Sequence, residues 1–344
     1  MGWEGQAVEY RPLGDTGMLA GEIGLGCEGM LEDGCRVAEM LLDAGAEGGI
    51  NYMDLFLPNP DLHEVLGRVL RGRRDQFLIQ GHIGSAWRDG QYVRTREIGE
   101  VRGAFEGLLA RLHTDWMDVG MIHYVDSMED WHGIINGPVA EYARGLLKEG
   151  RIRAVGMSSH NPKVALAAAE SGLIKVLMFS VNPCYDLLPA SEDIDTLWDP
   201  ASYAGGLTNM DPAREKLYAA CQRLGVGIAV MKAFGGGMLL GGGSPAGLAL
   251  TPCQCIHYAL TRPAVATVLS GARTVEELHQ CLRYGEAGES ERDYAEAFAR
   301  MPKFAWQGRC IYCGHCAPCP AGIDIAGLTR LFHQESAQGG ARER

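Results

Sequence analysis

Eight short apolar segments recur along the chain, and each is followed by a turn and then by a helical stretch. The segments are rich in Val, Ile, Leu and Met on both faces, which is typical of parallel strands covered by helices. Eight such alternations over about 260 residues favour a (β/α)8 TIM barrel of the α/β class over an open sheet. The expected strands are Glu22–Cys27, Ile50–Asp54, Phe77–Ile83, Met117–His123, Ile152–Ser158, Lys175–Val181, Gly227–Met231 and Val265–Ser270.

Two irregular regions interrupt this pattern and define the domain organisation. The barrel is expected over residues 1–285, and its longest irregular stretch, residues 183–211, is acidic and rich in turns. A loop of that length in a compact domain is usually functional, so we expect a lid over the C-terminal mouth of the barrel. Residues 286–335 are expected to form a small C-terminal helical segment around a cluster of cysteines, and residues 336–344 a loose tail.

The charge balance restricts the partners of the chain. With 31 basic and 43 acidic residues the net charge is −12, and no basic block stands out, so nucleic acid and anionic membranes are not expected partners. No apolar run approaches the roughly 18 residues of a membrane span, and the N-terminus lacks a signal-peptide core. We therefore expect a cytoplasmic protein, in which the 11 cysteines are ligands or buried thiols rather than disulfides.

A glycine pattern near the N-terminus needs an interpretation. Residues 24–29, Gly-Leu-Gly-Cys-Glu-Gly, satisfy the G-x-G-x-x-G pattern of dinucleotide-binding domains. That motif must open a helix at its last glycine, so that the helix N-terminus faces a pyrophosphate. The next helical signal begins only near Asp33, and we therefore interpret the pattern as a glycine-rich strand end.

Four cysteines lie close together near the C-terminus, and their spacing indicates an iron–sulfur centre. They are separated by two residues each and the last is followed by proline, a pattern close to the bacterial ferredoxin run that binds a [4Fe–4S] cluster. Zinc sites use paired C-x-x-C units with a longer spacer. The expected ligands are Cys310, Cys313, Cys316 and Cys319. The last spacing is one residue shorter than in ferredoxins, so Cys281 or Cys255 stays open as the fourth ligand.

Chemically active side chains gather where the expected strands end. In a (β/α)8 barrel the C-terminal strand ends form the active site. The positions there include an acid, histidines, a lysine and small polar residues, which packing alone does not favour: Asp54, His82, His123, Ser158, Ser159, Lys232, Ser270 and Gly271. The sequence therefore predicts a site at this mouth for a small-molecule substrate.

At this point the sequence resembles the aldo/keto reductase family, in particular its branch with a C-terminal [4Fe–4S] segment. The resemblance covers nearly the whole chain and rests on several motifs: YRPLGDTGMLAGEIGLGC, GINYMDLF, DWMDVGMIHYVD, GMSSHNP, MKAFGGG, LSGARTVEEL and CIYCGHCAPCPAGIDI. It implies a (β/α)8 barrel that binds NADPH or NADH without a Rossmann domain and reduces carbonyl compounds by hydride transfer.

The family's catalytic tetrad of Asp, Tyr, Lys and His is only half present. By the resemblance, Asp54 and His123 match the aspartate and the histidine, whereas Asn59 stands where the tyrosine is expected and His82 where the lysine is expected. An alkoxide formed by hydride delivery needs an acid within hydrogen-bond reach, and an amide is a poor proton donor. We therefore expect His123 to be the general acid or to orient the substrate, with His82 as its partner and Asp54 as electrostatic support. Tyr124 and Tyr185 are reserve donors.

The resemblance also implies cofactor contacts at the other strand ends. Ser158 and Ser159 match the pair that holds the carboxamide, and Ser270 and Gly271 match the phosphate-binding turn. Lys232 joins this set, and Arg273 is the main cation left for the phosphates, while Glu277 would repel a 2′-phosphate. NADH is therefore at least as suitable a cofactor as NADPH.

Three functions remain open on the sequence. The first is an iron–sulfur oxidoreductase in which the barrel reduces or oxidises a small organic substrate and the cluster passes single electrons to the barrel, with a redox partner protein as a further candidate partner. The second is a metal-dependent, non-redox enzyme, since Asp54, His82 and His123 form a two-histidine, one-carboxylate set. The third is a non-catalytic scaffold that senses redox state through the cluster.

Overall fold

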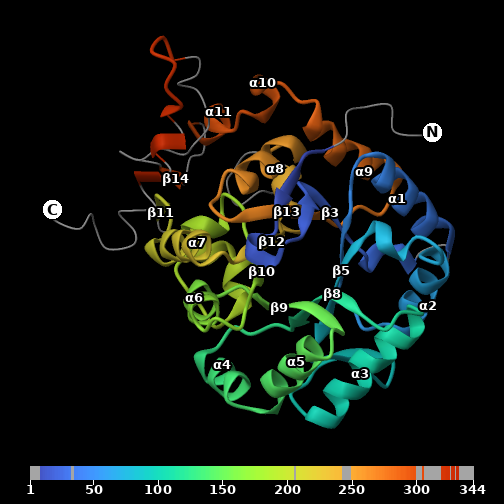
Figure 1. Cartoon of the computed structure of the whole chain (residues 1–344). Helices are drawn as coiled ribbons and strands as arrows, with labels where there is room; N and C mark the ends of the chain where they lie inside the picture. Colours follow the sequence, from blue (N-terminus) through green and yellow to red (C-terminus); the bar gives the residue numbers. More distant parts are fainter. Residues whose placement is uncertain are drawn as a thin grey trace.

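The computed structural model describes residues 8–31, 35–204, 207–241, 249–299, 304–305, 319–325, 327–329 and 331–332. Eight parallel strands in it close into a barrel, which Figure 1 shows with the helices around it. All eight strands predicted from the sequence are confirmed, with ends shifted by at most two residues. In barrel order they are β3 (Ile23–Gly26), β4 (Tyr52–Leu55), β5 (Leu78–Ile83), β8 (Met117–Ile122), β9 (Ile152–Ser159), β10 (Val176–Ser180), β12 (Gly227–Met231) and β13 (Val265–Ser270).

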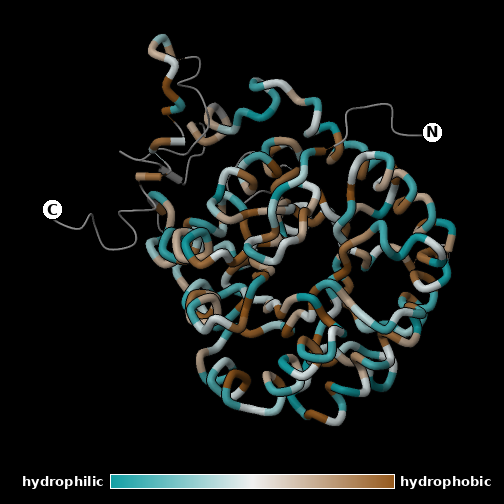
Figure 2. Tube along the Cα trace, viewed as in Figure 1, coloured by the Kyte–Doolittle hydropathy of each residue, from teal (hydrophilic) through white to brown (hydrophobic). Residues whose placement is uncertain are grey.

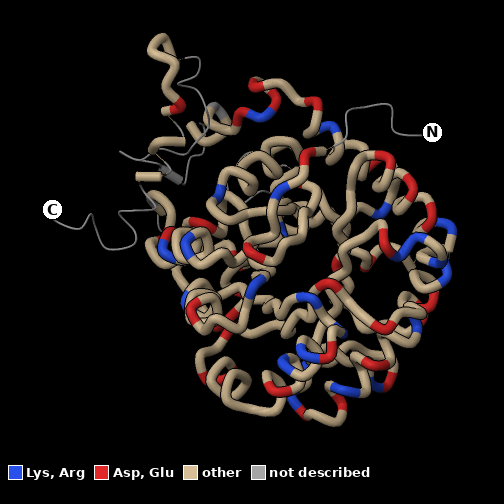
Figure 3. Tube along the Cα trace, in the orientation of Figure 1, with Lys and Arg blue, Asp and Glu red and all other residues tan. Residues whose placement is uncertain are grey.

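Helices follow the strands and cover the barrel from outside. They are α1 (Cys35–Glu47), α2 (Pro60–Val69), α3 (Ile98–Arg111), α4 (Met128–Ile135), α5 (Pro138–Lys148), α6 (Pro162–Glu170), α7 (Pro212–Leu224), α8 (Pro252–Leu260), α9 (Val275–Leu282), α10 (Glu289–Arg292) and α11 (Ala295–Ala299). None of the described helices is both long enough and apolar enough to cross a membrane. Charged residues concentrate on the outer helices and loops (Figure 3).

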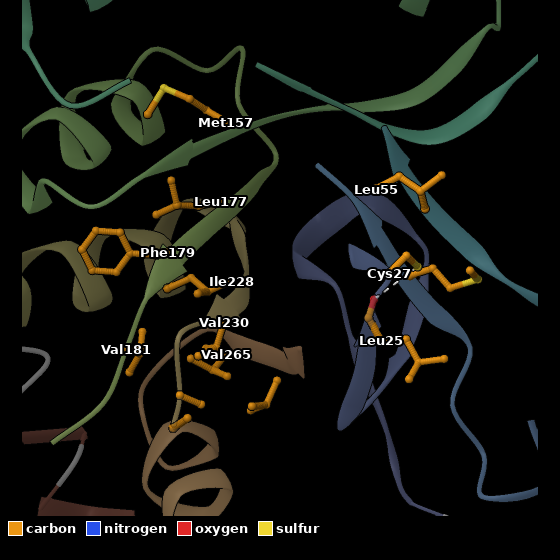
Figure 4. Packing of buried hydrophobic residues seen from close by; sticks show 14 of the residues in the cluster. Leu25, Cys27, Leu55, Met157, Leu177, Phe179, Val181, Ile228, Val230 and Val265 are labelled. Carbon is orange, nitrogen blue, oxygen red and sulfur yellow. Dashed lines mark hydrogen bonds between the residues drawn. The ribbon is translucent and has the colours of Figure 1, made fainter. Parts of the chain in front are cut away.

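Two apolar layers hold the barrel together. The larger lies between strands and helices. Alternate residues such as Leu177 and Phe179 of β10, and Val181 directly after this strand, point into it (Figure 4). The smaller fills the barrel interior, where Met121, Met178 and other side chains of the opposite strand faces meet. Both faces of each strand are therefore buried, which explains the continuous apolar runs of the sequence and the apolar strands of Figure 2.

The glycine-rich stretch after β3 does not open an α-helix. A short 3-10 helix, η2 (Glu28–Leu31), follows the strand, and α1 begins at Cys35. This confirms the interpretation of residues 24–29 as a strand end. The dinucleotide-binding geometry of an open sheet is therefore absent from this part of the described chain.

Short antiparallel hairpins lie outside the barrel sheet. β1 (Tyr10–Pro12) pairs with β2 (Leu19–Gly21), and side chains between and within them join the interior core. β6 (Ser85–Arg88) pairs with β7 (Gln91–Arg94) between β5 and α3, and its turn is Asp89–Gly90, both with positive φ. An Asp-Gly pair with this conformation is typical of a two-residue type I′ hairpin.

Apart from residues 205–206, the long segment 183–211 is described, and this part contains three 3-10 helices and one very short strand: η4 (Tyr185–Leu187), η5 (Ile194–Leu197), η6 (Pro200–Tyr203) and β11 (Leu207–Thr208). The strand pairs with β14 (Phe304–Ala305), so the backbone that leads toward the cysteine cluster lies beside this segment. Whether the segment acts as a lid stays a prediction.

A buried polar cluster anchors the segment to the barrel. The carboxylate of Asp186, which is fully buried, accepts hydrogen bonds from Tyr218 (2.6 Å), Tyr258 (2.8 Å) and Arg214 (3.3 Å). Arg214 is 1% exposed and also donates to the carbonyl of Ser180 at the end of β10. One carboxylate thus joins the start of the segment to helices α7 and α8.

We predict that Asp186→Ala lowers the free energy of unfolding by about 3–5 kcal/mol, because it leaves the Arg214 charge and two phenols without their shared acceptor. Urea unfolding followed by circular dichroism measures this. Asp195→Ala, at an exposed position of the same segment, is the matched control and should change the free energy by less than about 0.5 kcal/mol. Equal effects of the two substitutions would contradict the anchoring role.

Candidate active site

Three predicted catalytic residues meet because their strands are neighbours in the barrel. Asp54 on β4 is paired in register with Gln80 on β5, and His82 lies two residues further on the same face. The backbone N–H of His123 donates to the carbonyl of Ile83, which sets His123 beside the end of β5. All three side chains are nearly inaccessible, with exposed fractions of 2–5%.

These side chains form a hydrogen-bonded chain. Nε2 of His82 lies 2.9 Å from Oδ1 of Asp54, and Nδ1 of His82 lies 2.7 Å from Nδ1 of His123. Since a carboxylate only accepts, His82 donates from Nε2, and its Nδ1 then accepts from Nδ1 of His123. Gln80 also donates to Oδ1 of Asp54 (2.5 Å) and accepts from the Tyr52 hydroxyl, which fixes the carboxylate.

The sequence did not indicate the group at the outer end of this chain, which is Tyr92. Its hydroxyl lies 2.6 Å from Nε2 of His123, and because that nitrogen carries no proton in the order above, the hydroxyl donates. Tyr92 belongs to β7, so the hairpin carries the phenol across the mouth. The Asp-Gly turn between alternating residues was an available signal for this hairpin.

The hairpin is held firmly against the mouth. Thr95 N–H donates to the carbonyl of Gly84 at the base of the hairpin, 3.0 Å away. Next in the chain, Arg96 donates to the carbonyl oxygens of His123 and Tyr124 and pairs with Asp130 at 2.7 Å. Phe56 stacks on the His123 ring at 5.9 Å between centroids and contacts the Tyr92 ring edge-on.

Burial makes His123 a neutral acceptor. Desolvation, followed by the charges of His82, Arg96 and Arg94, holds the pKa of His123 well below its ordinary value. Desolvation also raises the pKa of Tyr92, whose residue is 37% exposed and thus reaches solvent. Near neutral pH the chain therefore contains a phenol, a neutral His123 and, at its inner end, Asp54.

Asn59 does not take the place of the missing tyrosine in the mouth. Its side chain caps α2 by accepting from the backbone N–H groups of Asp61 (2.8 Å) and Leu62 (3.2 Å). The Tyr185 hydroxyl is buried and finds no hydrogen-bond partner among the described residues, so it contributes to packing.

A single metal ion held by Asp54, His82 and His123 does not match this geometry. His82 directs one ring nitrogen to each neighbour, so the three groups form a line and do not converge on one point. Within the described ranges no group of three His, Cys, Asp or Glu side chains is arranged to hold a metal.

Some of the predicted cofactor residues are hydrogen-bonded to groups inside the protein, and others keep a donor or free space for a ligand. Ser158 accepts from the N–H of Tyr124 at 2.7 Å and keeps its own hydroxyl proton, whereas the Ser159 hydroxyl donates to Asp126. Ser270 directs its hydroxyl to Cys281 in α9. A Cβ at Gly271 would meet no atom within 4 Å, so the turn after β13 has free space around it.

Cations and carboxyl groups face each other across the mouth. Glu28 reaches solvent, yet the surrounding walls desolvate its carboxyl, and this effect with the charge of Asp54 raises its pKa to about 7. Lys232 and Arg273 act on Glu28 in the opposite direction. The Arg273 backbone N–H donates to Glu277 at 2.8 Å, so this carboxylate lies against the start of α9.

Of the predicted cluster ligands only Cys319 lies within the described residues; Cys310, Cys313 and Cys316 lie outside them, as does the predicted tail. Backbone N–H groups of Ile323, Ala321 and Gly322 lower the pKa of the Cys319 thiol. Donors directed at a thiolate are a common feature of iron–sulfur ligation.

The comparisons agree with the barrel fold. Residues 37–246 match the family model "Aldo/keto reductase family". The chain is 26% identical over 297 residues to the uncharacterized oxidoreductase YqkF of Bacillus subtilis, covering 81% of this chain and 92% of that protein. It is 27% identical to the aldo-keto reductase YhdN of the same organism over 161 residues, 44% of this chain and 47% of that protein.

Solved structures show the same fold. The aldo-keto reductase AKR11C1 of Bacillus halodurans, in its holo form, superposes with a TM-score of 0.66 at 22% identity over 85% of this chain and 96% of its own. The Pseudomonas aeruginosa protein PA4992, named as an aldo-keto reductase, superposes with a TM-score of 0.62 at 24% identity. The match covers 82% of this chain and 97% of that protein. The chain is therefore an oxidoreductase of the (β/α)8 aldo/keto reductase type. It belongs to the aldo/keto reductase family.

We predict that the His123 ring carries its proton on Nδ1 at pH 8, and that the ring stays neutral as the pH falls from 8 through its ordinary titration range near about 6.5. Two-bond 1H–15N correlation spectra distinguish a protonated from an unprotonated Nε2, and His123→Gln assigns the signal. If the His123 ring becomes positively charged with a midpoint near the ordinary value, the ring is not the neutral acceptor described here. A proton on Nε2 at pH 8 would contradict the order of donors and acceptors from Tyr92 to Asp54.

Proposed function

We propose that this protein is a nicotinamide-dependent carbonyl reductase in which Tyr92 exchanges a proton with the substrate and the His123–His82–Asp54 chain stores that proton. The observation that carries the proposal is the 2.6 Å hydrogen bond between the Tyr92 hydroxyl and His123, at the end of a continuous chain to a buried carboxylate. This replaces the expectation that His123 itself is the acid that faces the substrate.

The donor set of the mouth suits an anionic dinucleotide. Arg273 supplies a cation beside the open turn at Gly271, and Ser158, whose oxygen accepts from Tyr124, retains a hydroxyl proton that can be donated. Glu277 lies where it would repel a 2′-phosphate, so we favour NADH over NADPH as the cofactor. A bound reduced nicotinamide would supply the hydride to the carbonyl carbon.

The hydrogen-bonded chain from Tyr92 to Asp54 has two states, unloaded and loaded, and the loaded state holds one more proton. In the unloaded state, the hydrogen bonds run from Tyr92 through the histidines to the Asp54 carboxylate, as described above. In the loaded state Asp54 is a carboxylic acid, and the donor and acceptor of every hydrogen bond in this chain are exchanged. Nε2 of His123 then donates to the phenol oxygen. The Tyr92 proton is then free to point at a substrate oxygen.

Reduction uses the loaded state. As the carbonyl carbon gains a hydride, its oxygen takes the Tyr92 proton, and protons shift by one bond from Asp54 to His82, His123 and Tyr92. The phenol is restored, the Asp54 carboxyl is ionised, and one proton has left the protein for the product alcohol. Oxidation of an alcohol runs through the same steps in reverse. The partial exposure of Tyr92 allows reloading from solvent.

We predict that Tyr92→Phe lowers kcat about 100-fold or more in NADH-dependent reduction of small aldehydes, because general acid catalysis contributes on this scale. Nicotinamide fluorescence measures turnover and cofactor binding, and binding should change little. Tyr10→Phe, at an exposed tyrosine 50% accessible in β1, is the matched control with unchanged kcat. Wild-type activity in Tyr92→Phe would refute this assignment.

The proton balance gives opposite pH dependences. Reduction needs the loaded chain, so its kcat should fall as pH rises, while oxidation of the corresponding alcohol needs the unloaded chain and should speed up. Initial rates in both directions between pH 6 and 9, at saturating cofactor, test this prediction. Parallel profiles in the two directions would show that the chain does not store the transferred proton.

We further propose that a [4Fe–4S] cluster is bound by Cys310, Cys313, Cys316 and Cys319 and exchanges electrons with the barrel or with a redox partner protein. The backbone donors around Cys319 suit a thiolate ligand. The pairing of β14 with β11 brings Ala305 beside the segment 183–211, and four residues separate Ala305 from Cys310 in the sequence.

Anaerobically purified protein should show a broad absorbance near about 400 nm that dithionite bleaches, and Cys313→Ser should lose it. Cys35→Ser, a partly exposed cysteine in α1, is the matched control that keeps the absorbance. If the Cys313 variant loses iron but retains full turnover with NADH, the cluster does not take part in the reaction. Absence of iron from the wild-type protein would refute the site.

A further inference from the structure

A second chain of polar side chains crosses the mouth and has no part in the proton transfer described above. Nδ1 of His160 lies 2.8 Å from Oδ2 of Asp126, and Nε2 of His160 lies 2.8 Å from Nζ of Lys232. Asp126 also accepts from the His160 N–H (2.6 Å) and the Ser159 hydroxyl, so it is fixed in place. His160 donates to Asp126 through Nδ1, and Nε2 therefore accepts one N–H of Lys232.

The Lys232 ammonium lacks a close counter-ion. Among the described residues no carboxylate lies within 4.0 Å of its Nζ, and the partner that is found is a neutral ring nitrogen. Burial lowers the pKa of Lys232 to about 8, while the more distant charges of Asp126 and Glu28 oppose this effect. An ammonium that is largely desolvated and not paired gains stability from an anion that binds beside it.

The backbone holds Lys232 in an unusual conformation. Its φ is 60°, in the left-handed region that costs a residue with a side chain free energy, and Asn182 donates to its carbonyl at 2.9 Å. The ring of Trp198, from segment 183–211, lies 5.0 Å from Nζ. Such strain is retained where the surrounding structure needs a side chain at one position, which here is the interior of the mouth.

Tyr124 lies between this cation and the Tyr92–His123 pair. Its ring is 6.2 Å from the His123 ring and 5.5 Å from the His160 ring, so both chains border the same space. The turn expected to hold cofactor phosphates follows β13 and has its own cation, Arg273. An anion beside Lys232 therefore fits a substrate whose carbonyl group is held at Tyr92.

We propose that Lys232, oriented by His160 and Asp126, binds the carboxylate of the substrate, so that the enzyme acts on carbonyl compounds that carry a carboxylate a few bonds away. This inference rests on the proposed reductase function. It assigns to Lys232 a role in substrate selection in place of the cofactor contact expected from the sequence, and it makes Asp126 and His160 positioning residues.

The test compares an anionic aldehyde, 5-oxopentanoate, with its neutral methyl ester. We expect the ratio of their kcat/KM values to favour the acid in the wild type and to fall about tenfold or more in Lys232→Gln, with partial recovery in Lys232→Arg. Lys216→Gln, an exposed position on α7, is the matched control that keeps the ratio. Calorimetry with glutarate, which cannot be reduced, measures the subsite without turnover and should show binding that Lys232→Gln abolishes.

Each outcome decides between distinct conclusions. An unchanged ratio in Lys232→Gln, together with a raised dissociation constant for NADH, would overturn the proposal and place a cofactor phosphate at Lys232. Glutarate binding that does not depend on Lys232 would also overturn it. Lys232-dependent glutarate binding in a protein that reduces no carbonyl compound would support the anion subsite and refute the reductase function.

Discussion

The short contact between two buried imidazoles, His82 and His123, is the interaction on which the chemistry of the site depends. Two ring nitrogens 2.7 Å apart can share only one proton, so the state of one ring determines the state of the other. Asp54 fixes the inner ring, and the order of donors and acceptors is then determined as far as the Tyr92 phenol. This contact exists because β4, β5 and β8 are consecutive in the barrel and end at the same mouth.

The mouth combines two polar chains with different consequences. The first ends on the Tyr92 phenol, which solvent reaches and, in our proposal, a substrate reaches too. We propose that this chain stores the proton that the reaction transfers. The second ends on a lysine and contributes a fixed positive charge. Separate control of a proton and of a charge is a common way in which an active site combines catalysis with substrate selection.

The fold could be predicted from the sequence because each barrel strand has two buried faces. Continuous apolar runs such as residues 117–122 therefore mark the strands, and the polar residues that end them, Asp54 and His82 among them, mark the mouth. The same reasoning placed His123 in the site. These residues take their positions from the strand register, which the sequence pattern contains.

The parts that the sequence did not predict depend on loops. Tyr92 reaches His123 only through the arrangement of a hairpin over the mouth, which no periodicity describes, although its Asp-Gly turn was visible. The cap role of Asn59 and the bonds of Ser159 and Ser270 to internal partners follow from side-chain directions at strand and helix ends. The family motifs therefore predicted that these residues lie near the mouth, but they did not predict the hydrogen-bond partners of their side chains.

The central claim is that several protons move together when the substrate oxygen is protonated. The solvent isotope effect on kcat, measured in mixtures of H2O and D2O with a carbonyl substrate, tests this most directly. Our account predicts that kcat falls along a curved line as the deuterium fraction rises, since Tyr92, His123, His82 and Asp54 each transfer a proton in one step. A straight line, which indicates a single transferred proton, would contradict it.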